Sequence, residues 1–149
     1  MKKHLFFLLI SLLMRIVVMA QPKVIAHRGF WDTENSAQNS ITSLYKAYEA
    51  GCYGTEFDVH TTSDGVLVIF HDNEVNGMVI SQTPYEKLRD IKLKNGETIP
   101  TLEQYLVHAK NCPNIKLILE LKTGNLLAVK SAIPSIFLSA WMHVKKLSV

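Results

Sequence analysis

Two carboxylates and two histidines stand at the ends of strand-like segments of this sequence. Glu56 and Asp58 are two residues apart, and because successive side chains of a strand point to opposite faces, these two share a face. His27 and His71 each follow a short apolar run rich in β-branched residues. Carboxylates bind hard divalent cations, and imidazoles exchange protons near neutral pH. The combination predicts a metal-assisted site that cleaves a phosphodiester.

The composition indicates one globular domain without affinity for nucleic acid. The chain has 149 residues, 48% of them hydrophobic, which is enough for one core of ordinary size. The formal net charge is +3, but residues 1–20 hold three of the 16 basic residues and no acidic ones. The remainder carries 13 basic residues against 13 acidic ones. A neutral mature chain gives no reason to expect nucleic acid as a partner.

Residues 1–20 have the features of a secretory signal peptide. Met1-Lys2-Lys3-His4 precedes an apolar stretch, and Val18-Met19-Ala20 offers a site for signal peptidase. We therefore expect export to the periplasm or the extracellular space, with an uncleaved membrane anchor as the alternative. Cys52 and Cys112 could pair in such an oxidising compartment, but two unpaired thiols packed as small hydrophobes are the preferred interpretation.

Strands and helices alternate along the rest of the chain. Apolar and β-branched runs predict strands over residues 23–26, 55–60, 66–70 and 116–119. Helical spacing and capping residues predict helices over 40–50 and 101–110, with Thr83-Pro84 as a further helix start. Ser63-Asp64-Gly65 has the chemistry of a hairpin turn. The alternation favours an α/β fold with parallel strands, and parallel β/α barrels carry their chemistry at the carboxyl ends of the strands.

Taken together, the motifs resemble those of the glycerophosphodiester phosphodiesterases, a metal-dependent family built on a TIM barrel of the PLC-like phosphodiesterase type. The matching segments, in order, are Ala26-His27-Arg28-Gly29, Glu34-Asn35, Glu56-x-Asp58-Val59, Thr62-x-Asp64-Gly65, His71-Asp72 and Glu120-x-Lys122. Each segment is weak alone, whereas their order and spacing together are specific. The resemblance covers residues 21–123 and implies the N-terminal half of the catalytic domain, with about the first four β/α units.

The resemblance also implies a role for each matching residue. The ligands of a divalent cation, Ca²⁺ or Mg²⁺, would be Glu56, Asp58 and Glu120. The general acid and base would be His27 and His71. The substrate phosphate would be bound by Arg28 and Lys122. The implied reaction is hydrolysis of a small glycerophosphodiester to glycerol 3-phosphate and an alcohol such as choline or ethanolamine.

Three further residues are candidates for supporting roles, namely Glu34, Asn35 and Asp72. Glu34 could contact the substrate, cap a helix or steer Arg28, and the sequence leaves that choice open. Asp72 is expected to orient a neighbour through a hydrogen bond. Four histidines without motif support are expected to be structural or exposed: His4, His60, His108 and His143.

The resemblance weakens after about residue 123. A complete barrel of this type needs about 250 residues, so about half of it is expected to be missing. Residues 124–149 contain no Asp or Glu and show no strand and helix alternation, so they are expected to form an atypical tail. Membrane association is expected only through the signal or this tail. Exposed strand edges of a half barrel would favour self-association, and an inactive remnant or binding fragment is the alternative function.

Overall fold

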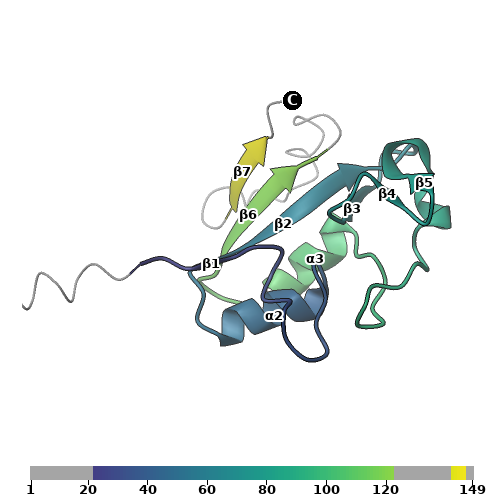
Figure 1. The fold of residues 1–149 in the computed structure, drawn as a ribbon. Helices are drawn as coiled ribbons and strands as arrows, with labels where there is room; N and C mark the ends of the chain where they lie inside the picture. Colours follow the sequence, from purple (N-terminus) through teal and green to yellow (C-terminus); the bar gives the residue numbers. More distant parts are fainter. Residues whose placement is uncertain (1–21, 123–141, 147–149) are drawn as a thin grey trace, which may run out of the picture.

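The computed structural model describes residues 22–122 and the backbone of residues 142–146. Its main sheet has the strand order β1 (Ile25–Ala26), β2 (Gly54–Thr61), β6 (Lys116–Leu121) and β7 (Met142–Lys146), with β3 (Leu67–Ile69) attached to β2. The helices α2 (Ile41–Glu49) and α3 (Leu102–Ala109) lie together below the sheet in Figure 1. This arrangement confirms the predicted α/β class.

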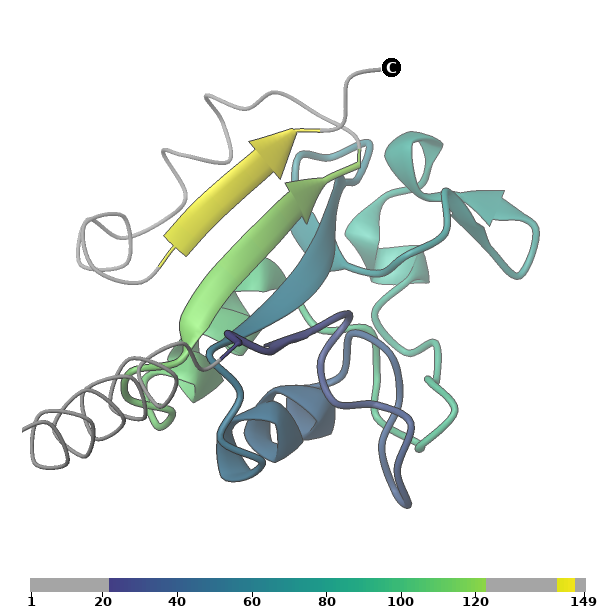
Figure 2. The same cartoon turned by 60° about the vertical axis from the view of Figure 1, so that its left-hand side comes forward.

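Four strands of the main sheet run parallel. β1 pairs with β2, β2 with β6, and β6 with β7, each in parallel register. Figure 2 shows β2, β6 and β7 side by side and pointing the same way. Their carboxyl ends therefore meet at one edge of the sheet. β7 lies inside the predicted tail over 124–149, where the sequence pattern indicates no strand, while the predicted signal segment over 1–20 lies outside the described residues.

β3 does not belong to the parallel set. It pairs with β2 in antiparallel register, so the strand predicted over 66–70 returns along its neighbour instead of following a crossover helix. Thr62 accepts the backbone N–H of Val66 at its hydroxyl, and its own N–H donates to the Val66 carbonyl, closing the hairpin. Gly65 takes a positive φ of 86° at the turn. The turn prediction was correct, but the expectation of a parallel strand here was wrong.

Both predicted helices are confirmed, and they pack on one face of the sheet. Ser40 accepts the N–H of Ser43 and caps α2, while Thr101 and Gln104 form a capping box at the start of α3. The main core lies between these helices and the sheet, and includes Leu44, Phe57, Val59, Tyr105, Leu117 and Leu119. Because strand residues alternate, burying Phe57 and Val59 against the helices turns Glu56 and Asp58 to the opposite face.

Residues 74–99 form a small insertion between β3 and α3. It holds the hairpin of β4 (Glu74–Val75) and β5 (Met78–Val79) and two short 3₁₀ turns, η1 (Ile80–Gln82) and η2 (Tyr85–Lys87). Ile80, Leu88 and Ile99 of the insertion form a second buried cluster with Val68 of β3. The helix start predicted at Thr83-Pro84 gives only the η2 turn, because the Thr83 hydroxyl donates back to Val79 instead of capping.

The described residues include no helix with the length and apolar character needed to cross a bilayer. Cys52 and Cys112 are both free thiols, in agreement with the preferred interpretation. Cys112 is buried in the main core, and Cys52 packs against the same core. Burial raises the pKa of the Cys112 thiol.

Candidate active site

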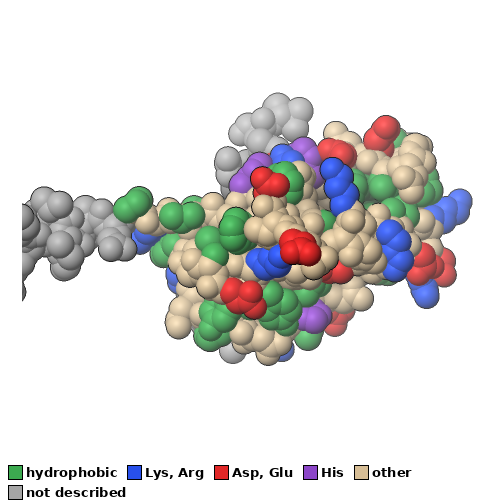
Figure 3. Space-filling view, turned by 60° about the horizontal axis from the view of Figure 1, so that its bottom comes forward, with side chains coloured by type: hydrophobic (Ala, Val, Ile, Leu, Met, Phe, Trp, Pro, Cys, Tyr) green, Lys and Arg blue, Asp and Glu red, His purple; other side chains and the backbone are tan. Residues whose placement is uncertain are grey.

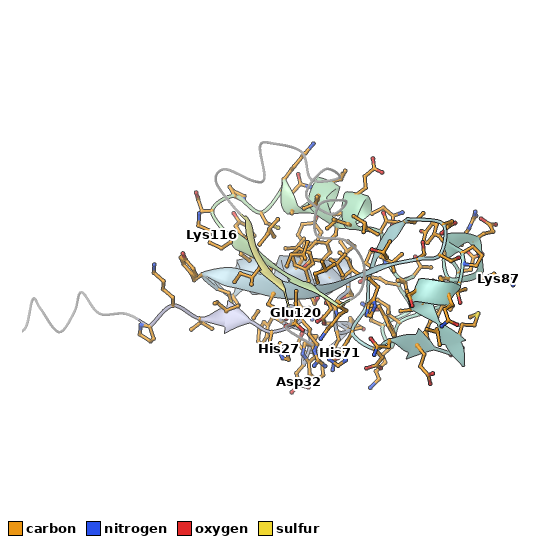
Figure 4. All side chains as sticks on the ribbon, turned by 90° about the horizontal axis from the view of Figure 1, so that it is seen from above. His27, Asp32, His71, Lys87, Lys116 and Glu120 are labelled. Atoms are coloured by element: carbon orange, nitrogen blue, oxygen red, sulfur yellow. The ribbon has the colours of Figure 1, made fainter. Side chains whose placement is uncertain are left out.

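Three carboxylates meet on the face of the sheet opposite the helices. Glu56 and Asp58 alternate with the core residues of β2, and Glu120 of β6 is the register partner of Asp58. One oxygen of each carboxylate lies within 4.8 Å of the others. Glu56 is only 9% exposed and Asp58 only 1%. In Figure 4 Glu120 lies close to His27 and His71, whereas Lys116 lies toward the other end of the same strand.

Burial disfavours the charged form of the Glu56 carboxylate. Burial raises its pKa to about 7 from an ordinary 4.5; the hydrogen bond from the Arg28 N–H opposes that shift, and the nearby Asp58 and Glu120 carboxylates add to it. The Arg28 N–H donates to Glu56 Oε2 at 2.9 Å, but buried Oε1 has no hydrogen-bond partner in the described part of the chain. A buried carboxylate oxygen without a partner, next to two other carboxylates, is stabilised by a cation.

Lys122 supplies one positive charge to the cluster. Its Nζ lies 3.1 Å from Asp58 Oδ1 and 2.5 Å from Glu120 Oε1. Burial alone would lower the pKa of Lys122, but the hydrogen bonds with Glu120 and Asp58 outweigh it and raise this pKa. The donor set therefore fits a hard divalent cation, because all three side chains offer oxygen and the Glu56 oxygen still lacks a partner. Glu56, Asp58 and Glu120 would hold such an ion.

Arg28 lies beside the carboxylates and reaches three side chains. Its Nη1 donates to Gln38 Oε1 at 2.9 Å, its Nη2 contacts His71 Nε2 at 2.7 Å, and its Nε lies 3.8 Å from Asp58 Oδ2. Gly29 follows with a φ of 79°, and a Cβ there would lie 2.1 Å from the Ser43 hydroxyl oxygen. Only glycine allows the turn to pass this close to α2.

His71 is fixed at both ring nitrogens. A guanidinium has donors only, so His71 Nε2 must accept from Arg28, and the ring proton lies on Nδ1. Nδ1 then donates to Asp72 Oδ1 at 2.7 Å. Asp72 thus orients its neighbour, as predicted. The arrangement leaves a neutral imidazole with a basic Nε2 facing Arg28.

His27 stands at an exposed edge of the cluster. Its side chain is 68% exposed, and Nε2 lies 3.9 Å from Glu56 Oε2. Figure 4 shows His27 and His71 close to each other below Glu120, along the lower edge of the view. The two imidazoles therefore lie close to the carboxylate cluster, one beside Glu56 and the other beside the Arg28 guanidinium.

Two of the three predicted supporting residues lie away from these contacts. Glu34 is exposed, and its carbonyl accepts from Lys46; Asn35 is also exposed, and its carbonyl accepts from Asn95. Arg28 is held by Gln38 instead of Glu34. Of the three roles that the sequence leaves open for Glu34, steering of Arg28 is not among the described contacts, whereas Glu34 does line the neighbouring cavity.

Sequence reasoning missed Gln38 and Asn39, which do contact site residues. Asn39 Nδ2 donates to Asp58 Oδ2 at 2.9 Å, and Asn39 Oδ1 accepts the Asp58 N–H at 3.2 Å. Asn39 is 1% exposed and has a φ of 61°. The available signal was position, because both residues directly precede Ser40, the cap of the helix that follows the first strand.

Of the four histidines without motif support, the two whose side chains the structure describes, His60 and His108, are structural, as expected. His60 is fully buried on the carboxylate face of β2, and its Nε2 donates to the His71 carbonyl at 3.4 Å. Burial lowers the pKa of His60. His108 Nδ1 lies 2.9 Å from the Tyr45 hydroxyl, away from the cluster. The predictions for His4 and His143 lie outside the described side chains.

A cavity of about 870 Å³ opens beside Arg28 and His71. Residues 31–34 and 36–39 form one wall, and the insertion contributes the other through Ile91, Lys92, Leu93 and Lys94. Figure 3 shows histidine, acidic and basic side chains grouped along the upper edge of the visible face. The cavity is large enough for a small organic molecule, and Arg28 belongs to its lining.

Comparison with known proteins gives consistent matches. The family model described as "Glycerophosphoryl diester phosphodiesterase family" matches residues 27–134, which include every site residue named above and extend past residue 123. A glycerophosphodiester phosphodiesterase of Caldanaerobacter subterraneus subsp. tengcongensis is 42% identical over 91 residues, covering 53% of this chain and 37% of that protein.

Solved structures of phosphodiesterases match the fold of this chain. A glycerophosphodiester phosphodiesterase from Parabacteroides distasonis superposes with a TM-score of 0.76 at 46% identity, covering 85% of this chain and 56% of that one. A phosphodiesterase from Oleispira antarctica, solved in complex with the product sn-glycerol-3-phosphate, gives a TM-score of 0.69 at 27% identity, covering 85% of this chain and 58% of that one.

The described sheet corresponds to part of the TIM barrel of these relatives, as predicted. The chain spans little more than half the length of the matched structures, and 37% of the bacterial relative. The family match covers more than half of the sequence and all of the site. The chain therefore belongs to the glycerophosphoryl diester phosphodiesterase family.

Proposed function

We propose that this chain provides the metal and phosphate site of an enzyme that hydrolyses glycerophosphodiesters to glycerol 3-phosphate and an alcohol. The observation that carries the proposal is the meeting of Glu56, Asp58 and Glu120 beside an Arg28–His71 pair, within a sequence of this family. The relative solved with sn-glycerol-3-phosphate supports the same product class.

The charged residues divide the binding work. A divalent cation, Ca²⁺ or Mg²⁺, would polarise a phosphoryl oxygen and offset the charge that develops there in the transition state. Arg28 would bind the phosphate through its forked donors, and Lys122 would add a second positive charge. The Arg28 and Lys122 side chains are both already held in place by carboxylate or amide partners. The site is therefore organised for an anion before substrate arrives.

The two histidines would move the protons. A hydroxyl oxygen of the substrate glycerol attacks phosphorus, and its proton passes to one imidazole while the bond to the alcohol breaks. The other imidazole donates a proton to the departing alcohol oxygen. Water then opens the resulting cyclic phosphate to glycerol 3-phosphate. His71 is suited to accept first, because its Nε2 already carries the lone pair.

The test is hydrolysis of glycerophosphocholine by the full chain, with Ca²⁺ or Mg²⁺ and again with chelator. We expect glycerol 3-phosphate release that requires the ion. His27→Ala should reduce turnover by about 10²–10⁴-fold with the fold intact. His108→Ala, whose imidazole contacts Tyr45 away from the cluster, is the matched control and should remain active.

Equal rates for the parent and His27→Ala would refute the proposal. An inactive parent, together with activity from a longer protein that includes a family-like C-terminal half, would favour the alternative of an inactive remnant. Light scattering on the same sample would test self-association through the edge at β1, where Val24 and Ile25 are 58% and 48% exposed.

We also propose that residues 1–20 are a secretory signal and that the protein is exported. The support is the basic start, the apolar stretch and the small residues around Ala20. Fractionation of expressing cells, followed by intact-mass measurement, tests this. A periplasmic or secreted product that begins at Gln21 is expected, and a product retaining Met1 in the membrane would support the anchor instead.

A further inference from the structure

Glu97 joins the insertion to the first turn of α2. Its Oε2 accepts the N–H of Ile41 at 2.9 Å, and its Oε1 accepts the N–H of Thr42 at 3.2 Å. The first N–H groups of a helix have no partner within the helix, so an external carboxylate satisfies them and complements the helix dipole. Ser40 satisfies the third, from Ser43. The start of α2 is therefore capped from two directions.

Glu97 is itself held in place. Asn95 Nδ2 donates to Glu97 Oε1 at 2.7 Å, and Asn95 Oδ1 accepts the Glu97 N–H at 3.2 Å. The carboxylate can therefore keep its geometry without help from the helix. A fixed carboxylate constrains the helix start more tightly than a mobile one would.

The turn that Glu97 caps directly follows the missed site residues. Gln38 and Asn39 directly precede the cap. Gln38 accepts from the Arg28 guanidinium, and Asn39 bonds to both the carboxylate and the backbone N–H of Asp58. The Asn39 N–H also donates to the Arg28 carbonyl at 3.0 Å, and the Ser43 hydroxyl donates to the same carbonyl at 3.3 Å. Any shift of this turn moves a phosphate ligand and a metal ligand together.

We propose that Glu97 is a positioning residue for Arg28 and Asp58, acting through the first turn of α2. The role in catalysis rests on the proposed function, but the positioning itself does not. Ser40 already provides an ordinary side-chain cap, so stability of α2 alone does not require a second, long-range one. The Glu97 contacts instead fix where the helix start lies relative to the carboxylate cluster.

The experiment compares the parent with Glu97→Ala, which removes both contacts, and with Asn95→Ala, which only loosens the carboxylate. Glu103→Gln is the matched control, because Glu103 is an exposed acid in the first turn of the other helix. The first readout is solvent exchange of the Asn39 side-chain amide by NMR, without metal or substrate. The second is Mg²⁺ or Ca²⁺ affinity by calorimetry. Circular dichroism verifies that each variant is folded.

We expect Asn39 amide exchange to become about fivefold faster in Glu97→Ala, the factor expected for loss of a cap, and less so in Asn95→Ala. Divalent-ion affinity should fall by at most about tenfold, the low end of the loss seen when an outer partner of a metal ligand is removed, because Glu97 acts on Asp58 only through Asn39. Glu103→Gln should change neither. A folded Glu97→Ala whose Asn39 exchange matches that of the parent would overturn the proposal. Hydrolysis of glycerophosphocholine is assayed on the same variants. Changed Asn39 exchange with no hydrolysis by any of them, the parent included, would overturn the proposed function and leave the positioning role standing.

Discussion

The Arg28 guanidinium donates a hydrogen bond from Nη2 to Nε2 of His71 across 2.7 Å. The other ring nitrogen, Nδ1, carries the proton and donates it to Asp72 Oδ1. The two contacts together fix the tautomer of His71 and the direction in which Nε2 points. A phosphate that draws the Arg28 donors away would leave His71 Nε2 free beside it. Phosphate binding and release of the base would then be one event.

The first prediction concerns the orientation of His71. His71→Ala should lower kcat by about 10²–10⁴-fold, because it removes a proton acceptor. Asp72→Ala should lower kcat less, since the imidazole remains but can rotate, and Asp72→Asn should restore part of the loss through its amide oxygen. Steady-state kinetics on glycerophosphocholine measure all three. Identical rates for Asp72→Ala and the parent would contradict the role given to Asp72.

The second prediction concerns pH and Glu56. Its pKa is about 7 in the folded chain against 4.5 ordinarily, so between these values the unfolded chain has lost a proton that the folded chain retains. Stability of the metal-free protein should therefore fall by about 3 kcal/mol as pH rises from below 4.5 to above 7. Urea unfolding in chelator at pH 4 and pH 8 measures it.

Glu56→Gln is the control for that titration. The variant should have a flatter stability profile over the same pH range, and it should lose the stabilisation that a divalent ion gives to the parent. Divalent-ion affinity of the parent should rise with pH up to about 7, because the ion competes with the Glu56 proton. A parent whose stability is constant over this range would show that Glu56 is not protonated in the folded state.

The third prediction separates Asn39 from Asn35. Both have left-handed backbone, with φ values of 61° and 58°, which Asp also tolerates. Asn39→Asp places a carboxylate against buried Asp58 and should cost about 1–3 kcal/mol of unfolding free energy. Asn35→Asp changes the same groups at an exposed site and should stay within about 0.5 kcal/mol. Thermal and urea unfolding compare the two directly.

The fourth prediction concerns the turn after Arg28. Gly29→Ala would place a Cβ 2.1 Å from Ser43 Oγ at a φ of 79°, so it combines backbone strain with a steric clash. We expect a loss of about 2–5 kcal/mol. Gly77→Ala is the matched control, since its φ is 75° and no heavy atom lies within 4 Å of the added carbon. It should cost only about 1–2 kcal/mol. Equal losses would mean that contact with α2 is unimportant.

The strand and helix pattern could be predicted where local signals agreed with the tertiary structure. Ser40 and Thr101 mark the helix starts because side-chain caps are local, and Glu56 and Asp58 share a face because strand periodicity is local. The parallel direction expected for the strand over 66–70 was wrong, because an apolar run does not show whether a strand pairs in parallel or antiparallel register. Only the turn at Ser63-Asp64-Gly65 indicated a hairpin.

The supporting residues could not be found the same way. Asn39 meets Asp58, and Gln38 meets Arg28, through contacts that depend on how the chain returns after the first strand. Glu34-Asn35 was chosen because it matched a motif by residue type, although Gln38-Asn39 has a similar pair of side chains four residues later. Residue type selects candidates, but hydrogen-bond partners four or more residues away depend on the folded backbone.

The pairing of Asp58 with Glu120 also has a kinetic consequence. These metal-ligand candidates are register partners on β2 and β6, yet the hairpin, the insertion and α3 all lie between them along the chain. Bringing such distant strands together costs loop-closure entropy and makes parallel pairing slow. If that pairing forms after the folding transition state, a divalent ion that needs both strands should slow unfolding and leave the folding rate nearly unchanged. Stopped-flow folding and unfolding rates, measured against denaturant concentration with and without the ion, would test this. The ion would then protect the finished structure without guiding its formation.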